Sequence, residues 1–410
     1  MFLADAPRDT DTAIFQPRDI VAQGPHDNRL PFPTLRVKYH GQVCDVVETV
    51  IPLGPFADVH LFTKRNKDGV DVGLNDPAYF QISPTSGHFA PTVVGEVLAL
   101  TRHANVMITH WKCASDVTLK DARTFDLSDY VFDYVLKFMR DFGHPLVLGG
   151  YSQSGVTATA ATALASSGKG QAPPPIGLII SGSPLDVEAE PSSLSSLTRT
   201  LGLRALEANF REVGPSRLGR GRLILPGEAQ LQALLLAETG RLMMDQFIFG
   251  GQLMMTTPFK ALEKLQARHA RARELSHTAD LPAELVLHIA EEGFIKASLP
   301  KGELMLNGQR VDPTQITVPI LAIGGERDQI VPPGQVMAIQ TLCPRADIET
   351  VLVRGANHFQ LKSGGAWQGE ILPAYVRLLH AADETLSTPQ KAARAAKLRA
   401  LIHTSAARPH

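Results

Sequence analysis

The sequence has few cysteines and no long apolar run, and each of these absences excludes a class of protein. Its three cysteines, Cys44, Cys113 and Cys343, form no C-x-x-C pair, which argues against a disulfide framework and against a zinc site. No stretch of about 18 apolar residues is present, so we expect no transmembrane helix. The first residues, MFLADAPRDTDTAIFQ, have no basic stretch followed by an apolar one, so we expect no secretory signal. These features predict a cytoplasmic protein.

The sequence also lacks an excess of either charge. Its 40 basic and 41 acidic residues give a formal net charge of −1, which gives no indication of a nucleic-acid partner. Its 410 residues, 44% of them hydrophobic, are enough for a large core. We therefore expect either one large domain with an insertion or two domains.

Short apolar segments alternate with segments of helical spacing. The residues 127–143, LSDYVFDYVLKFMRDFG, have apolar side chains at helical intervals and end in glycine, so they predict a helix. Strands are predicted at NVMITHW (105–111), PLVLGG (145–150), IGLIISGSP (176–184), TVPILAIGG (317–325) and IETVLVRG (348–355). This alternation predicts an α/β fold with a mostly parallel sheet covered on both faces.

The alternation stops in the middle of the chain and then resumes, which suggests an inserted cap. We expect an irregular N-terminal arm (1–40), a first part of the α/β core (41–188), a helical cap insertion (189–315), a second part of the core (316–385) and a basic C-terminal tail (386–410). The cap contains FIFGGQLMMTTPF (247–259), in which Phe247 and Met254 are candidates either for core packing or for an apolar binding surface. The tail is interpreted as a solvated terminal helix, with contact to an anionic surface as the alternative.

The segment GGYSQSG (149–155) follows a predicted buried strand and precedes a predicted helix. A nucleophilic serine in such a turn needs small residues two positions before it and two after it. Ser152 meets this condition, with Gly150 before it and Ser154 after it. Ser154 does not, because the β-branched Val156 follows it. The alternative is a serine that only caps a helix.

A serine nucleophile needs a base and an acid, and both follow predicted strands. Asp328 comes just after TVPILAIGG, and His358 just after IETVLVRG, in the order Ser, acid, His that is typical of the α/β-hydrolase fold. Asp186, after IGLIISGSP, is the second candidate for the acid, with helix capping as its alternative role. Glu326 is expected to be structural.

The oxyanion of the tetrahedral intermediate that a serine nucleophile forms needs two hydrogen-bond donors. The first is predicted to be the backbone N–H of Gln153. The second is expected from the loop SPTSGHF, with Ser86 or Gly87 favoured, while His88 is expected to line the site.

The chain resembles intracellular poly(3-hydroxybutyrate) depolymerases from about residue 35 to 380. The likeness lies in ISPTSGHFAPTVVGEVLAL, FIKASLPKGELMLNGQRVDPTQI, PILAIGGERDQIVPPGQ and NHF. More distantly the chain is similar to polyhydroxyalkanoate synthases. It departs from the depolymerases in having Ser152 where they have cysteine, and His110 where they have aspartate before the tryptophan. The serine argues against a synthase, whose chain-holding nucleophile is cysteine.

The resemblance implies a serine hydrolase with a helical cap that cleaves poly(3-hydroxybutyrate) or its oligomers. Such an enzyme is expected to need no metal and no organic cofactor. The side chains expected to contact the substrate are those of Tyr151, His88, Phe247 and Met254. Association with storage granules is expected, whereas the sequence does not predict the number of subunits. The alternatives are a carboxylesterase, thioesterase or acyltransferase acting on small acyl esters, and a granule-binding protein without catalysis.

Overall fold

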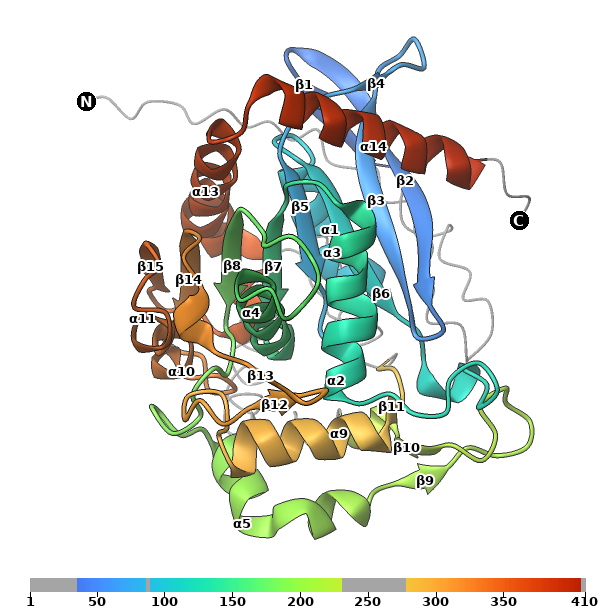
Figure 1. Ribbon diagram of the computed structural model, residues 1–410, viewed down its shortest axis with the longest axis vertical. Helices are drawn as coiled ribbons and strands as arrows, with labels where there is room; N and C mark the ends of the chain where they lie inside the picture. The colour runs from blue at the N-terminus through green and yellow to red at the C-terminus, as the bar shows by residue number, and fades with distance from the viewer. Residues whose placement is uncertain (1–34, 86–88, 231–277, 407–410) are drawn as a thin grey trace, which may run out of the picture.

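A ten-stranded sheet forms the centre of the molecule (Figure 1). The computed structural model describes residues 35–85, 89–230 and 278–406. The strand order is β1-β2-β3-β6-β5-β7-β8-β14-β15, with β4 paired to β3. The bounds are β1 (Leu35–Tyr39), β2 (Gln42–Gly54), β3 (Ala57–Arg65), β4 (Asp71–Val72), β5 (Ala78–Ile82), β6 (Asn105–Trp111), β7 (Val147–Tyr151), β8 (Gly177–Ser181), β14 (Ile320–Gly325) and β15 (Ile348–Val353).

Six neighbouring strands of this sheet, β6, β5, β7, β8, β14 and β15, are parallel to one another. β1, β2 and β3 pair antiparallel, and β3 joins β6 antiparallel. Parallel strands need crossover connections, and helices supply them here. The predicted fold class, an α/β-hydrolase fold with a mostly parallel sheet, is confirmed by this topology.

Helices cover both faces of the sheet. Successive side chains of β8 point to opposite faces and all are buried, so each face must be covered. Leu178 and Ile180 pack in one hydrophobic cluster, whereas Ile179 packs in the other. The first cluster includes side chains of the helix built from α2 (Leu127–Asp129), η3 (Tyr130–Leu136) and α3 (Lys137–Phe142), and of α4 (Gln153–Ser166), α10 (Pro333–Met337) and α11 (Ile339–Leu342). The second includes side chains of α1 (Phe89–Leu100), η7 (Trp367–Ile371) and α13 (Leu372–Glu384).

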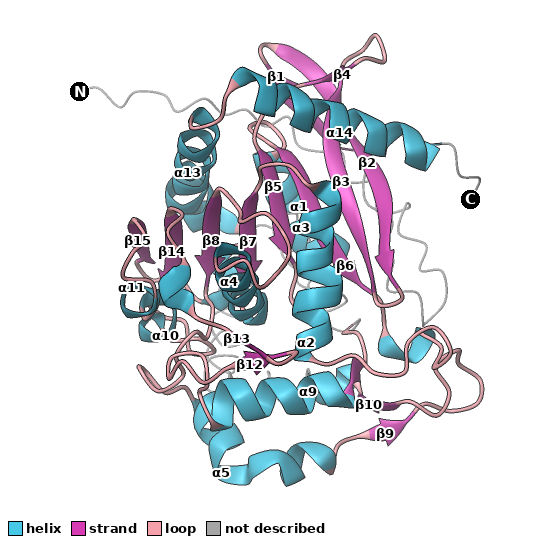
Figure 2. Ribbon diagram, viewed as in Figure 1, coloured by secondary structure: helices cyan, strands magenta, loops and turns pink. Residues whose placement is uncertain are grey.

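The described residues of the expected cap, in α5 (Ser193–Glu207), α9 (Ala283–Ile289) and the short strands beside them, lie beyond the end of the sheet toward which β7 and β8 run (Figure 1). The other described elements between β8 and β14 are β9 (Arg211–Glu212), β10 (Leu223–Leu225), β11 (Leu281–Pro282), η4 (Ala290–Ile295), β12 (Met305–Leu306), β13 (Gln309–Arg310) and η5 (Pro313–Gln315). The short strands (Figure 2) were not predicted, because segments of two or three residues have no detectable period.

The predicted division into domains stays a prediction. Residues 1–34 of the expected arm lie outside the described residues, and Leu35–Tyr39 form the edge strand β1. Residues 231–277 of the expected cap, which include Phe247 and Met254, also lie outside them.

The C-terminal segment forms α14 (Thr388–Ala406), which differs from the predicted solvated helix. Arg394, Leu398 and Ile402 are buried, and Leu398 and Ile402 belong to the same cluster as the side chains of α4. Figure 1 shows α14 lying across β2 and β3. The prediction was wrong because Lys391, Arg394, Lys397 and Arg399 were interpreted by their charge rather than by the apolar residues between them.

Candidate active site

The turn after β7 holds Ser152 in a backbone conformation that side chains rarely adopt. Its φ of 56° and ψ of −133° lie outside the regions that non-glycine residues favour, so surrounding contacts must hold it. A Cβ at Gly150 would lie 2.6 Å from the Ser154 carbonyl oxygen, and one at Gly155 would lie 1.9 Å from Ser183 Oγ. Glycine is therefore required on both sides of the turn, and the turn is as crowded as a nucleophile elbow must be.

The two serines of this turn have different surroundings. Ser154 is fully buried, and its Oγ accepts a hydrogen bond from the Tyr151 N–H (2.9 Å) and donates to the Ile82 carbonyl (2.6 Å). Ser152 Oγ instead lies 3.0 Å from His358 Nε2. Ser154 thus links the turn to β5, and Ser152 is the serine that faces a base.

The imidazole of His358 lies between Ser152 and Asp328. Its Nδ1 is 2.7 Å from Asp328 Oδ2, while Asp328 Oδ1 accepts hydrogen bonds from the backbone N–H groups of Ile330 (3.0 Å) and Val331 (2.8 Å). Asp328 and His358 are only 3% and 4% exposed. A carboxylate fixed at both oxygens favours the tautomer with the proton on Nδ1, which leaves Nε2 free to accept the serine proton.

The parallel sheet brings these three residues together. Ser152 follows β7, Asp328 follows β14 and His358 follows β15, and the carboxyl ends of parallel strands lie at one edge. The structure therefore places the predicted nucleophile, acid and base within hydrogen-bonding distance of one another in the predicted order.

The second candidate acid lies elsewhere. Asp186 Oδ1 accepts a hydrogen bond from the Glu188 N–H (2.9 Å), so it closes a turn, and the carboxylate beside the imidazole belongs to Asp328. Glu326 Oε2 accepts from the Gly355 N–H (2.7 Å) and so joins the loops that follow β14 and β15, in keeping with the structural role expected for it.

Gln153 is the first residue of α4, so its backbone N–H is one of the free donors at a helix start. Its side chain accepts a hydrogen bond from Thr85 Oγ1 (3.0 Å), which ties the loop after β5 to the turn. The other predicted donors, Ser86 and Gly87, and the predicted lining residue His88 lie outside the described residues.

Sequence reasoning missed two groups around His358. The Tyr151 hydroxyl donates a 2.9 Å hydrogen bond to the His358 carbonyl oxygen, although Tyr151 was expected to contact substrate. Gly182 has a φ of +52°, and a Cβ there would lie 3.2 Å from Cε1 and Nδ1 of His358. No sequence pattern indicated the first contact, whereas the small residues of SGSP after β8 were a weak signal for the second.

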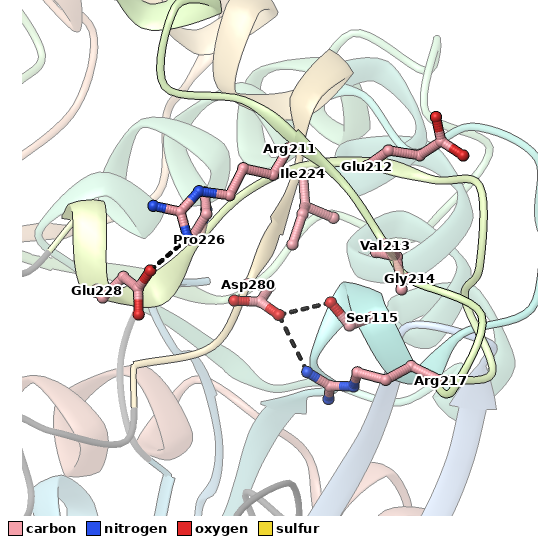
Figure 3. A pocket seen from close by; sticks show the side chains of 10 residues that line it. All are labelled: Ser115, Arg211, Glu212, Val213, Gly214, Arg217, Ile224, Pro226, Glu228 and Asp280. Atoms are coloured by element: carbon pink, nitrogen blue, oxygen red, sulfur yellow. Dashed lines mark hydrogen bonds and ion pairs between the residues drawn. The ribbon is translucent and has the colours of Figure 1, made fainter.

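A separate polar cavity of about 280 Å³ lies beside β9 and β10 (Figure 3). Asp280 accepts hydrogen bonds there from Ser115 Oγ (2.5 Å) and from the Arg217 guanidinium (3.3 Å), while Arg211 pairs with Glu228 at 2.7 Å. Its lining includes none of the residues around Ser152, and it carries two arginines and three carboxylates, those of Glu212, Glu228 and Asp280.

Within residues 35–85, 89–230 and 278–406, no group of three or more His, Cys, Asp or Glu side chains is placed to hold a metal ion. No helix in the same ranges is long and apolar enough to cross a membrane. All three cysteines are buried and free.

Comparison with known proteins finds two matches whose names refer to polyhydroxyalkanoates. Residues 182–383 match the family model described as PHB de-polymerase C-terminus, where PHB is poly(3-hydroxybutyrate). A segment of 100 residues, 24% of the chain, is 32% identical to the poly(3-hydroxyalkanoate) polymerase subunit PhaC of Haloferax mediterranei. That segment spans only 20% of the length of the polymerase subunit.

This chain has the α/β-hydrolase fold and is similar, over part of its length, to a polyhydroxybutyrate depolymerase family and to a polyhydroxyalkanoate polymerase subunit. Two solved structures are also similar to it. A monoglyceride lipase from Saccharomyces cerevisiae is 14% identical, with 86% of this chain and 99% of the lipase covered and a TM-score of 0.45. The alpha/beta hydrolase domain-containing protein 10 from mouse is 12% identical, with 83% and 100% covered and a TM-score of 0.43.

Proposed function

We propose that this chain is a serine hydrolase that cleaves the ester bonds of short-chain polyhydroxyalkanoates, chiefly poly(3-hydroxybutyrate) or its oligomers. The observation that carries the proposal is the alignment of Ser152 Oγ, His358 and Asp328 at 3.0 and 2.7 Å in a chain that matches the depolymerase family model over residues 182–383. The family match suggests the polymer as substrate, and the aligned side chains suggest the chemistry.

The mechanism follows from the positions of these atoms. His358 Nε2 takes the proton of Ser152 as Oγ attacks the ester carbonyl, and Asp328 stabilises the resulting imidazolium. The Gln153 N–H donates a hydrogen bond to the developing oxyanion. The imidazolium then protonates the departing alcohol, which leaves an acyl group on Ser152. Water, deprotonated by His358, releases the acid and restores the serine.

The raised pKa values of the three cysteine thiols support serine, rather than cysteine, as the nucleophile. Burial raises the pKa of the Cys113 thiol to about 11 and that of Cys343 to about 12, and it also raises the pKa of Cys44. A thiol with so high a pKa is almost wholly protonated at neutral pH and is a poor nucleophile. Synthase chemistry of the kind that holds a growing chain on cysteine therefore has no candidate thiolate here. Association with polymer granules in the cytoplasm is part of the proposal.

The test measures the release of 3-hydroxybutyrate from amorphous, protein-free granules by the wild type and by Ser152→Ala. We expect release by the wild type and a loss of at least about a thousandfold in the variant, because removal of a triad nucleophile typically costs that much or more. Granule binding without product by either protein would favour a binding protein and overturn the proposal.

A second arm separates the polymer from other substrates. Simple aliphatic esters and 3-hydroxybutyryl-CoA are offered to the same two proteins. Turnover of small esters that depends on Ser152, without release from granules, would support a general esterase. Polymer growth from the thioester would support acyl transfer instead.

A further inference from the structure

Tyr151 contacts the candidate base at two points. It is the last residue of β7 and directly precedes Ser152. Its hydroxyl donates a hydrogen bond to the His358 carbonyl oxygen (2.9 Å), and its ring centroid lies 5.0 Å from that of the imidazole, with an angle of 30° between the planes. The tyrosine therefore holds both the backbone and the ring of His358.

A buried ion pair also lies close to this tyrosine. Lys362 ends the short turn η6 (His358–Leu361), and its Nζ is 5.4 Å from the Tyr151 ring centroid. The same Nζ is 2.7 Å from Glu96 Oε1 and 3.2 Å from the Tyr375 hydroxyl. An ammonium at this distance over an aromatic face is attracted to it, most strongly where water is excluded.

The charge on Lys362 persists at neutral pH. Burial lowers the pKa of this ammonium, but the Glu96 carboxylate and the Tyr375 hydroxyl outweigh that effect, so the pKa lies above its ordinary value. The side chains of Lys362 and Glu96 are only 9% and 2% exposed, so solvent screens their charges little.

The base needs such support because of where it lies. His358 begins a turn of only four residues, so little regular structure fixes its imidazole. Its Nε2 must stay beside Ser152 while Nδ1 stays beside Asp328, and small displacements of reacting groups lower rates sharply. Because Tyr151 is adjacent to Ser152 in the chain, one side chain links the loop of the base to the turn of the nucleophile.

We propose that Tyr151 is a positioning residue, which fixes His358 relative to Ser152 and is itself held by the buried Lys362–Glu96 pair. The proposal rests on the proposed function, since it takes Ser152 and His358 as nucleophile and base. It assigns Tyr151 to the base, whereas the sequence suggested contact with substrate.

The test is Tyr151→Phe, which removes the hydroxyl and keeps the ring. We expect kcat on a soluble 3-hydroxybutyrate trimer to fall about tenfold, the effect of losing roughly one net hydrogen bond, while KM stays within about twofold. The rate at which diethyl 4-nitrophenyl phosphate labels Ser152 should fall by a similar factor, because this small reagent needs the base but no polymer site.

The matched control is Tyr134→Phe. Tyr134 is buried, and its hydroxyl accepts a hydrogen bond from the Phe56 N–H (3.2 Å). We expect this control to lower the melting temperature and leave kcat and the labelling rate unchanged. Melting curves of both variants establish that the assayed protein is folded.

Two results would overturn the proposal. A higher KM with unchanged kcat and labelling would make Tyr151 a substrate contact, and unchanged kcat, KM and labelling would make its hydroxyl merely structural. The labelling arm also separates the two proposals, because it needs Ser152 and His358 but no polyester substrate. Slower labelling of Tyr151→Phe would support the positioning role even if the polyester were not hydrolysed.

Discussion

Gly182 shows how closely the residues around the base are fitted. It follows β8 with a φ of +52°, and an added Cβ would lie 2.9 Å from Leu361 Cδ1 and 3.2 Å from the His358 ring. We expect Gly182→Ala to lower kcat by about tenfold or more, because the methyl group displaces an imidazole whose position sets the rate. The measurement is kcat on the soluble trimer, together with the free energy of unfolding in urea.

The control for this variant is Gly168→Ala. Gly168 also has a positive φ (+75°), but nothing lies within 4 Å of its Cβ position. Both variants should lose about 1–2 kcal/mol of stability from left-handed backbone strain, and only Gly182→Ala should lose kcat. Equal kcat values in the two variants would show that the imidazole tolerates the methyl group.

At the residue scale, the sequence predicted the residues that follow strands and missed those that pack around them. Ser152, Asp328 and His358 were identifiable because parallel strands end at one edge of a sheet, so three separate segments predict one site. Tyr151 was expected to contact substrate, and the direction of its hydroxyl toward the His358 carbonyl depends on how the loop after β15 folds back. Lys362 had no signal, because a lysine near a chain turn is ordinarily solvated.

At the scale of elements, a buried arginine adds polar contacts to the apolar packing of α14. Arg394 is fully buried, and its guanidinium pairs with Asp383 (2.6 Å) and donates to the backbone carbonyls of Asn75 (2.8 Å) and Asp76 (3.0 Å). The arginine thus joins α14 to the end of α13 and to the loop before β5.

We expect Arg394→Met to lower the free energy of unfolding by about 3 kcal/mol, because it removes the buried guanidinium that donates to two backbone carbonyls and to Asp383, which retains its ion pair with Lys391. Arg399→Met on the exposed face of the same helix should change it by less than about 0.5 kcal/mol. Urea unfolding followed by circular dichroism measures both. Similar small losses in the two variants would mean that α14 is held by its apolar side chains alone.

The sequence did contain a signal for this packing. Ala395, Leu398 and Ile402 are spaced by three and four residues, the interval of one helix face, and all three are buried in the core cluster. The alanines around them made the stripe hard to recognise, because alanine is common on both buried and exposed faces. The short strands differ among themselves. β10 pairs with β11 from a distant segment, which no local pattern encodes, whereas β12 and β13 are joined by Asn307 and Gly308, a hairpin turn signal that sequence reasoning missed.

At the scale of the whole molecule, the second part of the core is completed only by contact with the first. β14 pairs with β8 across the insertion, and Lys362 pairs with Glu96 across 266 residues of sequence. Glu96 belongs to α1, whereas Lys362 follows the candidate base, so this ion pair fixes the loop of His358 to the N-terminal half of the sheet. The site is therefore expected to form only when both halves have assembled.

The ion pair predicts a distinct result for single and double variants. Lys362→Met leaves the buried Glu96 carboxylate without its ammonium and should lower the free energy of unfolding by about 3–5 kcal/mol. The double variant Glu96→Leu with Lys362→Met removes both charges and should recover stability to within about 1 kcal/mol of the wild type, since apolar replacement of a buried pair is often close to neutral.

Activity should not return together with stability. The double variant still lacks the ammonium that holds the Tyr151 ring, so we expect its labelling by diethyl 4-nitrophenyl phosphate to remain slower than that of the wild type even though it unfolds at nearly the same urea concentration. Urea unfolding and labelling of the same preparations measure the two effects separately. Full recovery of the labelling rate would mean that the Lys362–Glu96 pair contributes to stability but does not position the base. Recovery of stability alone would mean that this pair both joins the two halves of the core and positions the base.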